Sequence, residues 1–299
     1  MTEHRVVFDF EVDFVNGGGL QGHDFRLDID GDDILDAALA DLIVADLRLL
    51  MVGAVRITRK RIVEEPHKRS AAIIELSHPI RDGMVTYPGL PGPVIGTHLS
   101  REASRERYAP GTEFHIGTIS MVGNTGTYVD VPFHRFADGA DLAAMPASAL
   151  AHLPGIVARV AGRRAIEAEA LEALRRLRVQ SRPGISKLHA AAVLFHTGHD
   201  RHFGTPAYAA HAPFLTEATA ERLIAAGAAL VGIDSLNVDS TEDPRRPVHT
   251  ALLRAGIPIV EHLTNLDQLP DEGFELTAVP APIEGLGSFP VRVIARLGR

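Results

Sequence analysis

Most of the chain after residue 70 is organised around one stretch, Asn124-Thr125-Gly126-Thr127-Tyr128-Val129-Asp130-Val131-Pro132-Phe133-His134. Asp130 and His134 stand on either side of Pro132, whose ring fixes its φ at about −65°. Gly126 can adopt a positive φ at little cost. Glycine and proline this close together favour a loop or a strand end over a helix. Such a segment can offer a carboxylate to a metal and an imidazole for proton transfer, although an Asp in a turn and a surface His are the simpler alternative.

Composition limits the class of protein. The 299 residues allow one large or two ordinary domains, and 45% hydrophobic with 23% charged residues is ordinary for a globular chain. The absence of cysteine excludes disulfides, thiolate zinc sites and cysteine nucleophiles. The net charge of −8 argues against a nucleic-acid surface, and no apolar run reaches the roughly 18 residues of a membrane helix. We therefore expect a cytoplasmic protein that binds neither nucleic acid nor membranes.

Residues 1 to 65 are predicted to form a small ββαβ unit of unknown role, for which we recognise no family. Its predicted elements are strands over 5–15 and 25–29, a helix from Asp32 or Asp33 to about Met51, and a strand over 55–63. The unit is short for an independent core. The charged segment 64–69 contains a proline and is the predicted boundary.

Residues 71 to 299 are predicted to form a mixed α/β domain. Alternating or continuous apolar runs predict strands, and apolar residues at helical spacing predict helices. The predicted strands cover 73–76, 113–122, 156–160, 191–195, 230–233, 257–260, 275–279 and 291–295, and the predicted helices cover 165–177, 216–226 and 249–255. Strands separated by helices indicate an α/β class.

Polar side chains at the ends of these strands are the candidates for chemistry. They are Asp130, His134, His196, His199, Asp200, His202, Asp234, His249 and Glu261. Asp130, His249 and Glu261 would form a set of one imidazole and two carboxylates, which suits Zn, Mn or Fe. Water on such a metal becomes a nucleophile near neutral pH, and His134 could act as the general base or acid. Spacing alone leaves many other triples open, because the chain has 15 His and 38 acidic residues.

Residues 71 to 299 resemble the cyclase-like metal-dependent hydrolase family, which includes kynurenine formamidase, isatin hydrolase and trans-dienelactone hydrolase. The family signature is His-x-Gly-Thr-His-x-Asp-x-Pro-x-His. Residues 124–134 match its Gly, Thr, Asp, Pro and last His, whereas Asn124 and Tyr128 replace its first two histidines. The other matching segments are Tyr87-Pro88-Gly89, Gly232-Ile233-Asp234, His249 with Glu261 twelve residues later, and Phe289-Pro290-Val291-Arg292.

The resemblance implies a swivelling β/β/α fold and a homodimer or homotetramer. Carried over position by position, it implies Asp130, His249 and Glu261 as metal ligands and His134 as the acid/base. Asn124 can add only a neutral amide oxygen. Tyr128, with an ordinary pKa of about 10, is a ligand only as a phenolate. Oxygen-rich coordination would favour Mn or Mg over Zn.

Three interpretations follow from the two substituted positions. In the first, one divalent metal, Mn or Zn, sits on Asp130, His249 and Glu261, helped by oxygen from Asn124 or Tyr128. In the second, there is no metal, and Tyr128 and His134 act together on a carbonyl substrate. In the third, the site is inactive and the protein is a binding subunit.

We expect a hydrolase of a small amide or lactone that carries a carboxylate, with water as the nucleophile. Tyr87 is predicted to wall the substrate pocket, with a cover over the core as the alternative. Arg201 is predicted to clamp the carboxylate, because arginine binds carboxylates through two parallel hydrogen bonds; a surface salt bridge is the alternative. His202 and the other histidines of 196–202 are predicted to line the pocket or to supply a missing ligand.

Overall fold

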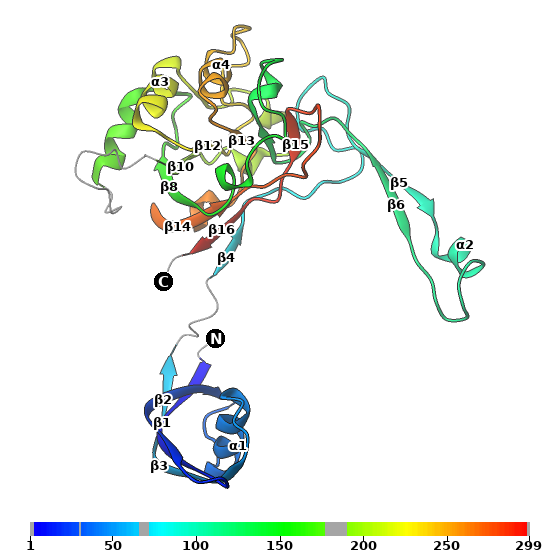
Figure 1. Cartoon of the computed structure of the whole chain (residues 1–299). Helices are drawn as coiled ribbons and strands as arrows, with labels where there is room; N and C mark the ends of the chain where they lie inside the picture. The colour runs from blue at the N-terminus through cyan, green and yellow to red at the C-terminus, as the bar shows by residue number, and fades with distance from the viewer. Residues whose placement is uncertain (1–2, 30, 66–71, 177–189, 298–299) are drawn as a thin grey trace. The chain divides into compact units, whose positions relative to one another are not determined.

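The computed structural model describes residues 3–29, 31–65, 72–176 and 190–297. The chain divides into two compact units, residues 1–70 and 71–299 (Figure 1). Each unit is described on its own. In the described ranges, no helix has both the length and the apolar character needed to cross a membrane.

The first unit is a three-stranded antiparallel sheet, ordered β2-β1-β3, with one helix. Its elements are β1 (Glu3–Phe14), β2 (Gly19–Ile29), α1 (Asp36–Asp46) and β3 (Val52–Glu65). The apolar face of β1 packs against Leu39 and Ile43 of α1 and forms a separate core. This agrees with the predicted ββαβ order.

Helix α1 is shorter than predicted, and the predicted cap is wrong. Leu35 occupies the N-cap position without a side-chain hydrogen bond, and the Asp33 carboxylate accepts from the adjacent Ile34 N–H, which precedes the helix. The helix ends at Asp46 because Arg48 and Met51 adopt left-handed φ values of 51° and 60°. In the predicted boundary segment, Glu64 and Glu65 belong to β3, and residues 66–69 lie outside the described ranges.

The second unit is built on a nine-stranded mixed sheet with the order β15-β7-β13-β12-β10-β8-β14-β16-β4. Its strands in this sheet are β4 (Ile73–Glu75), β7 (Tyr128–Asp130), β8 (Leu153–Arg159), β10 (Ala192–His196), β12 (Leu230–Ile233), β13 (Ile259–Glu261), β14 (Glu272–Thr277), β15 (Ser288–Pro290) and β16 (Ile294–Leu297). The central strands β8, β10, β12 and β13 are parallel. The α/β class predicted from the sequence is confirmed.

The remaining elements are short. They are β5 (Val94–Leu99), α2 (Arg101–Arg105), β6 (Ile116–Ser120), β9 (Ala165–Ile166), β11 (Phe214–Leu215), α3 (Glu217–Ala226), α4 (Pro247–Arg254) and the 3₁₀ helices η1 (Pro132–His134), η2 (Ala147–Ala149), η3 (Ala168–Arg176), η4 (Asp200–His202), η5 (Pro206–Tyr208) and η6 (Leu266–Gln268). Strands β5 and β6 pair as a two-stranded antiparallel ribbon separate from the nine-stranded sheet (Figure 1). The sequence predicted only part of this ribbon.

Two predicted elements of the second unit are wrong. The predicted helix 165–177 begins as strand β9, because Ala165 and Ile166 pair with β11, and continues as 3₁₀ helix η3. Residue 177 lies outside the described ranges. Of the predicted strand 291–295, only Ile294 and Ala295 belong to a strand, β16, and residues 291–293 connect it to β15, with Val291 and Val293 buried.

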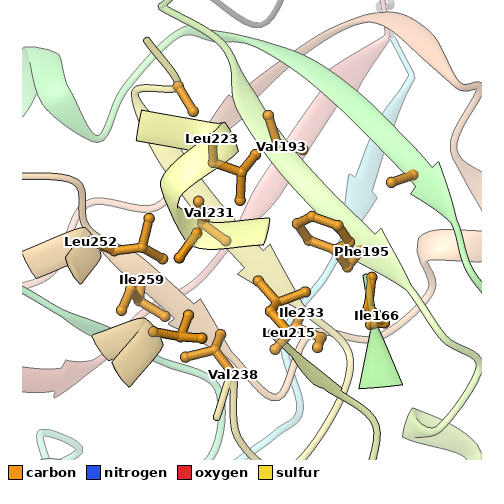
Figure 2. Packing of buried hydrophobic residues seen from close by; sticks show 14 of the residues in the cluster. Ile166, Val193, Phe195, Leu215, Leu223, Val231, Ile233, Val238, Leu252 and Ile259 are labelled. Carbon is orange, nitrogen blue, oxygen red and sulfur yellow. The ribbon is translucent and has the colours of Figure 1, made fainter. Parts of the chain in front are cut away.

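The parallel strands of the sheet are buried on both faces. Successive side chains of a strand point to opposite sides, so each strand contributes to two cores. Val193 and Phe195 of β10 enter one core, together with residues of α3 and α4 (Figure 2). Ala192 and Leu194 of the same strand enter the core on the other face. The chain therefore places α4 on the face to which Ile259 of β13 points.

That arrangement brings distant residues to one end of the sheet. Helix α4 follows β12 and precedes β13, so it crosses over between two neighbouring parallel strands. Strand β7 runs antiparallel beside β13, with Tyr128 opposite Glu261 and Asp130 opposite Ile259. Residues at positions 128, 130, 249 and 261 thus meet, although they span 133 residues of sequence.

Candidate active site

A pocket of about 470 Å³ opens over this end of the sheet. It is lined by Tyr87, Pro88, Gly89, Leu90, Asn124, Tyr128, Asp130, His134, Arg135, Asn237, Arg246, His249 and Glu261. The volume suits a small molecule, since ligand pockets are typically about 300–1,000 Å³. The pocket gathers seven of the predicted site residues, and Arg201 and His202 are not among the lining residues.

The buried side chains of Tyr128, Asp130, His249 and Glu261 form the floor of this pocket. Asp130 lies between His249 and Ser288. Its side chain is completely buried, and Ser288, directly opposite on β15, donates a hydrogen bond to its Oδ1. Its other oxygen, Oδ2, is buried without a hydrogen-bond partner and lies 3.6 Å from His249 Nε2. Burial alone raises the pKa of Asp130, but His249, His134 and Ser288 outweigh it and lower the pKa. Asp130 is therefore an ionised carboxylate with one open oxygen.

His249 is held by an aspartate that sequence analysis missed. Asp239 Oδ2 accepts from His249 Nδ1 at 2.7 Å and from the His249 backbone N–H at 2.9 Å, and its Oδ1 accepts from Val248 N–H at 2.7 Å. Asp239 thereby satisfies two backbone donors in the first turn of α4. The bond to Nδ1 leaves Nε2 facing Asp130 Oδ2 and Glu261 Oε1, each at 3.6 Å.

The electrostatics of His249 reflect its three carboxylate neighbours. Burial lowers its pKa, but contacts with Asp130 and Asp239 and the charge of Glu261 raise it to about 10. Without a metal, this ring is therefore a positively charged imidazolium near neutral pH, with a proton on both nitrogens. Metal binding would have to displace one of these protons, because imidazole coordinates only through an unprotonated nitrogen.

Glu261 is bonded at both oxygens. Its Oε1 accepts from Val238 N–H at 2.7 Å, and its Oε2 accepts from the Tyr128 hydroxyl at 2.5 Å. Tyr128 and Glu261 are direct cross-strand neighbours, which explains this contact. Burial, together with the nearby Asp130, raises the pKa of Glu261 to about 7.

The two positions that depart from the family signature act here as hydrogen-bond donors. Burial and the charge of Glu261 raise the pKa of Tyr128 well above its ordinary range, so the phenol stays protonated. Asn124 directs its Nδ2 amide group toward Asp130 Oδ1 at 3.4 Å. Each side chain donates a hydrogen bond to a carboxylate of the pocket floor, where a histidine ligand would offer a lone pair to a metal.

His134 stands at the edge of the floor, with its side chain 36% exposed. Its Nδ1 lies 2.7 Å from Ser288 Oγ. Because the serine hydroxyl donates to Asp130, it accepts from His134 Nδ1–H, and the basic nitrogen of this ring is Nε2. Ser288 was not predicted; its signal was its place directly before the Phe289-Pro290 match.

Two glycines permit this close assembly. Gly126 has a φ of 67°, as its predicted freedom allowed, and its N–H donates to Thr86. A Cβ on Gly287 would lie 2.2 Å from the backbone nitrogen of His134. Glycine at 287 therefore lets the start of β15 approach His134 closely enough for Ser288 to reach it.

The predicted residues of the 196–202 segment have other partners. His196 contacts the Arg159 guanidinium at 3.1 Å, and His199 Nε2 lies 2.8 Å from the Tyr208 carbonyl oxygen. Asp200 accepts from the Thr264 hydroxyl at 2.8 Å. Arg201 donates to His202. These groups connect loops, and none of them lines the pocket.

Asp234 also has a structural environment. It accepts from the Thr197 N–H, the Thr197 hydroxyl and the Gly198 N–H at 2.6–2.8 Å. These bonds tie the loop after β10 to the end of β12. Both oxygens of Asp234 are occupied by this loop.

The chain belongs to the cyclase family. Residues 74–240 match the family model described as "Putative cyclase", which confirms the resemblance inferred from the sequence. Among its relatives, a kynurenine formamidase of Bacillus cytotoxicus is 28% identical over 223 residues, covering 75% of this chain and 96% of the relative. A kynurenine formamidase of Bacillus cereus is 27% identical over 225 residues, with the same coverage.

Solved structures show the same fold. An isatin hydrolase bound to the product analogue thioisatinate superposes with a TM-score of 0.62 at 20% identity, covering 76% of this chain and 92% of its own. A structure described as a potential metal-dependent hydrolase with cyclase activity has a TM-score of 0.58 at 23% identity, covering 75% and 96%. These likenesses confirm the predicted cyclase-like fold.

Proposed function

We propose that this protein is a hydrolase that cleaves a small amide or lactone with water, using one divalent metal held on the pocket floor. The observation that carries the proposal is the buried Oδ2 of Asp130, which accepts no hydrogen bond and lies 3.6 Å from His249 Nε2 in an open pocket. The relatives named kynurenine formamidase favour an amide as the bond that is cleaved.

The residues on the floor fit a metal ion. Asp130, His134 and His249 each offer a ligand atom within 4.8 Å of the others, and Glu261 Oε1 is 3.6 Å from His249 Nε2. Ligand atoms at about 2.1 Å from one ion stand roughly 3–3.5 Å apart, so the 3.6 Å distances from His249 Nε2 to Asp130 and to Glu261 need only small side-chain movements. Asp130 and His249 would hold the ion with Glu261 beside them, and carboxylates with one imidazole suit Mn²⁺ or Zn²⁺.

One ion, and not two, is favoured by the two substituted positions. Tyr128 is a protonated phenol bonded to Glu261, and the Asn124 amide nitrogen faces Asp130. Neither group offers a free lone pair toward the carboxylates, so neither position can supply a ligand for a second cation as a histidine would. Asn124 and Tyr128 thus complete the floor without being ligands themselves.

A divalent cation in this position would polarise the substrate carbonyl and lower the pKa of water. His134 supplies the acid/base function. Its Nε2 would take a proton from the attacking water as the new C–O bond forms. It would return that proton to the amide nitrogen or lactone oxygen as the old bond breaks. Ser288 and Asp130 keep the His134 ring in the tautomer that this transfer needs.

The test is metal content and turnover together. Protein purified without chelator should contain about one Mn, Zn or Fe per chain, and this metal should be lost in Asp130→Ala. A panel of formamides, isatins and lactones should include at least one substrate that is hydrolysed. Turnover that persists without metal would favour the metal-free pair of Tyr128 and His134, and no turnover with any substrate would favour a binding protein.

We also infer a homo-oligomer that works in the cytoplasm. The β5–β6 ribbon supports the oligomer, because it exposes Val94, Ile95, Ile116 and Ile119, and two-stranded ribbons are marginally stable alone in water. A second copy of the chain is the partner we propose for it. The mass in solution should be that of a dimer or tetramer, and Ile119→Asp should lower it.

A further inference from the structure

The rim of the pocket has a charge opposite to that of its floor. Asp130 and Glu261 lie on the floor, whereas Arg135 and Arg246 are also among the residues that line the pocket. Among the described residues, neither arginine has a carboxylate within 4.0 Å. Arg245, which precedes Arg246 and does not line the pocket, is paired with a carboxylate. It donates to both oxygens of Asp243 at 2.8–3.0 Å.

Arg246 is held in place by neutral oxygens. Its Nη1 donates to the Ser240 carbonyl oxygen at 2.8 Å, and its Nη2 donates to the Tyr87 hydroxyl at 3.3 Å. A guanidinium has five N–H donors, so three remain for a ligand. Tyr87 accepts from Arg246, and its own O–H is left to donate to the same ligand.

The position of Arg246 follows from the start of α4. It occupies the N-cap position in a left-handed conformation, with φ 50° and ψ 60°, directly before Pro247. His249 follows three residues later, and residues at this spacing lie on the same side of a helix. One short helix therefore presents a cation at the rim and the floor imidazole to a single pocket.

We propose that Arg246, with Tyr87, binds a carboxylate on the substrate, so that the scissile carbonyl points to the floor. The orientation of the scissile carbonyl rests on the proposed hydrolase function. The binding of an anion by Arg246 and Tyr87 does not depend on it. It replaces Arg201 as the predicted carboxylate clamp, since Arg201 donates to His202 and does not line the pocket. The substrate class is a small aromatic or aliphatic amide with a carboxylate.

The experiment compares two amides that differ only in a carboxylate, 2-formamidobenzoate and formanilide. Wild-type protein should prefer the acid, measured as the ratio of the two kcat/KM values. Arg246→Ala should lower this ratio roughly 10- to 100-fold, as expected for the loss of a hydrogen-bonded charge pair. Arg246→Lys should lower it less, because it keeps the charge and loses the planar fork. Arg245→Ala is the matched control and should leave the ratio unchanged.

Binding of 2-formamidobenzoate, measured by calorimetry on the same proteins, separates the two proposals. Hydrolysis of both amides with a ratio that Arg246→Ala does not change would overturn the carboxylate site and leave the hydrolase. No hydrolysis, with binding that weakens at least tenfold in Arg246→Ala but not in Arg245→Ala, would support the site and reject the hydrolase. Neither hydrolysis nor binding would overturn both.

Discussion

Asp130 and Asp234 are both buried aspartates at the ends of strands of one sheet, yet their surroundings differ completely. Asp234 accepts three hydrogen bonds from a single loop, and both of its oxygens are used. Asp130 keeps one oxygen without a partner, beside His249 and open to a pocket. A buried carboxylate oxygen that has no hydrogen bond, lies 3.6 Å from a possible ligand nitrogen and opens into a pocket is available to a ligand. A fully bonded one indicates a structural role.

The largest expected effect comes from removing the carboxylate of Asp130, the aspartate that opens into the pocket. Asp130→Ala should abolish metal binding and lower kcat/KM on the order of 10³-fold or more, because several kcal/mol of charge stabilisation are lost. Metal per chain and turnover measure it. Asp234→Ala is the matched control, and this variant should keep about one metal per chain. An Asp130→Ala protein that keeps metal and activity would refute the assignment.

The second prediction breaks the structural side. Asp234→Ala should reduce the free energy of unfolding by about 2–4 kcal/mol, because it leaves the buried N–H groups of Thr197 and Gly198 without an acceptor. Urea unfolding at fixed metal concentration measures this. Asp234→Asn should cost less, since the amide oxygen still accepts. A loss of metal with unchanged stability would reverse the comparison.

His134 tests how far the metal set extends. If it is the acid/base, His134→Ala should lower kcat on the order of 10²-fold and keep about one metal per chain. Its ring also lies within the group of Asp130 and His249. Loss of the metal in this variant would therefore make His134 a ligand, and full activity would remove both roles.

Asp239 tests the support behind the floor. Asp239→Asn should weaken metal affinity about 10- to 100-fold, as is usual when the partner of a ligating histidine is changed. Its amide can still accept from the backbone N–H groups at the start of α4, so helix content should change little. Metal titration and circular dichroism measure the two effects. Equal affinity in variant and wild type would show that His249 needs no such support.

The smallest expected effect concerns His78, a second buried side chain with an atom that makes no hydrogen bond. His78 Nε2 is also buried without a hydrogen-bond partner, but this ring stacks on Phe203 at 3.7 Å, and burial lowers its pKa from 6.5 to about 4. Leaving one nitrogen of a neutral imidazole without a hydrogen bond costs less free energy than leaving a charged oxygen without one. The unpaired nitrogen of His78 therefore does not mark a ligand site.

This neutral state predicts a dependence of stability on pH. Between pH 6.5 and about 4 the unfolded chain binds a proton at His78 that the folded chain does not, so stability falls as the pH falls through this window. The slope is at most about 1.4 kcal/mol per pH unit, and less because the ring is partly exposed. His78→Phe keeps the stacking and should remove this part of the slope in unfolding curves. Parallel curves for both proteins would contradict it.

Sequence patterns identified the parallel strands well, because continuous apolar runs such as 230–233 are required when both faces of a sheet are buried. Helix limits were predicted less well. The predicted helix 165–177 failed because pairing of Ala165 and Ile166 with β11 overrides local helical spacing. The predicted cap of α1 failed because the Asp33 carboxylate accepts from the N–H of Ile34, which precedes the helix, and Leu35 occupies the N-cap position.

The α/β class and the family could be predicted from the sequence, because these depend on local patterns and on a short signature. Which polar residues lie together became visible in the three-dimensional structure. Ser288 is 158 positions from Asp130 and meets it through the pairing of β15 with β7. Arg246 and Asp239 join the site through α4, whereas Asp234 and the 196–202 segment are drawn into loop contacts. Side-chain partners across a sheet are set by strand order and register, which no single stretch of sequence contains.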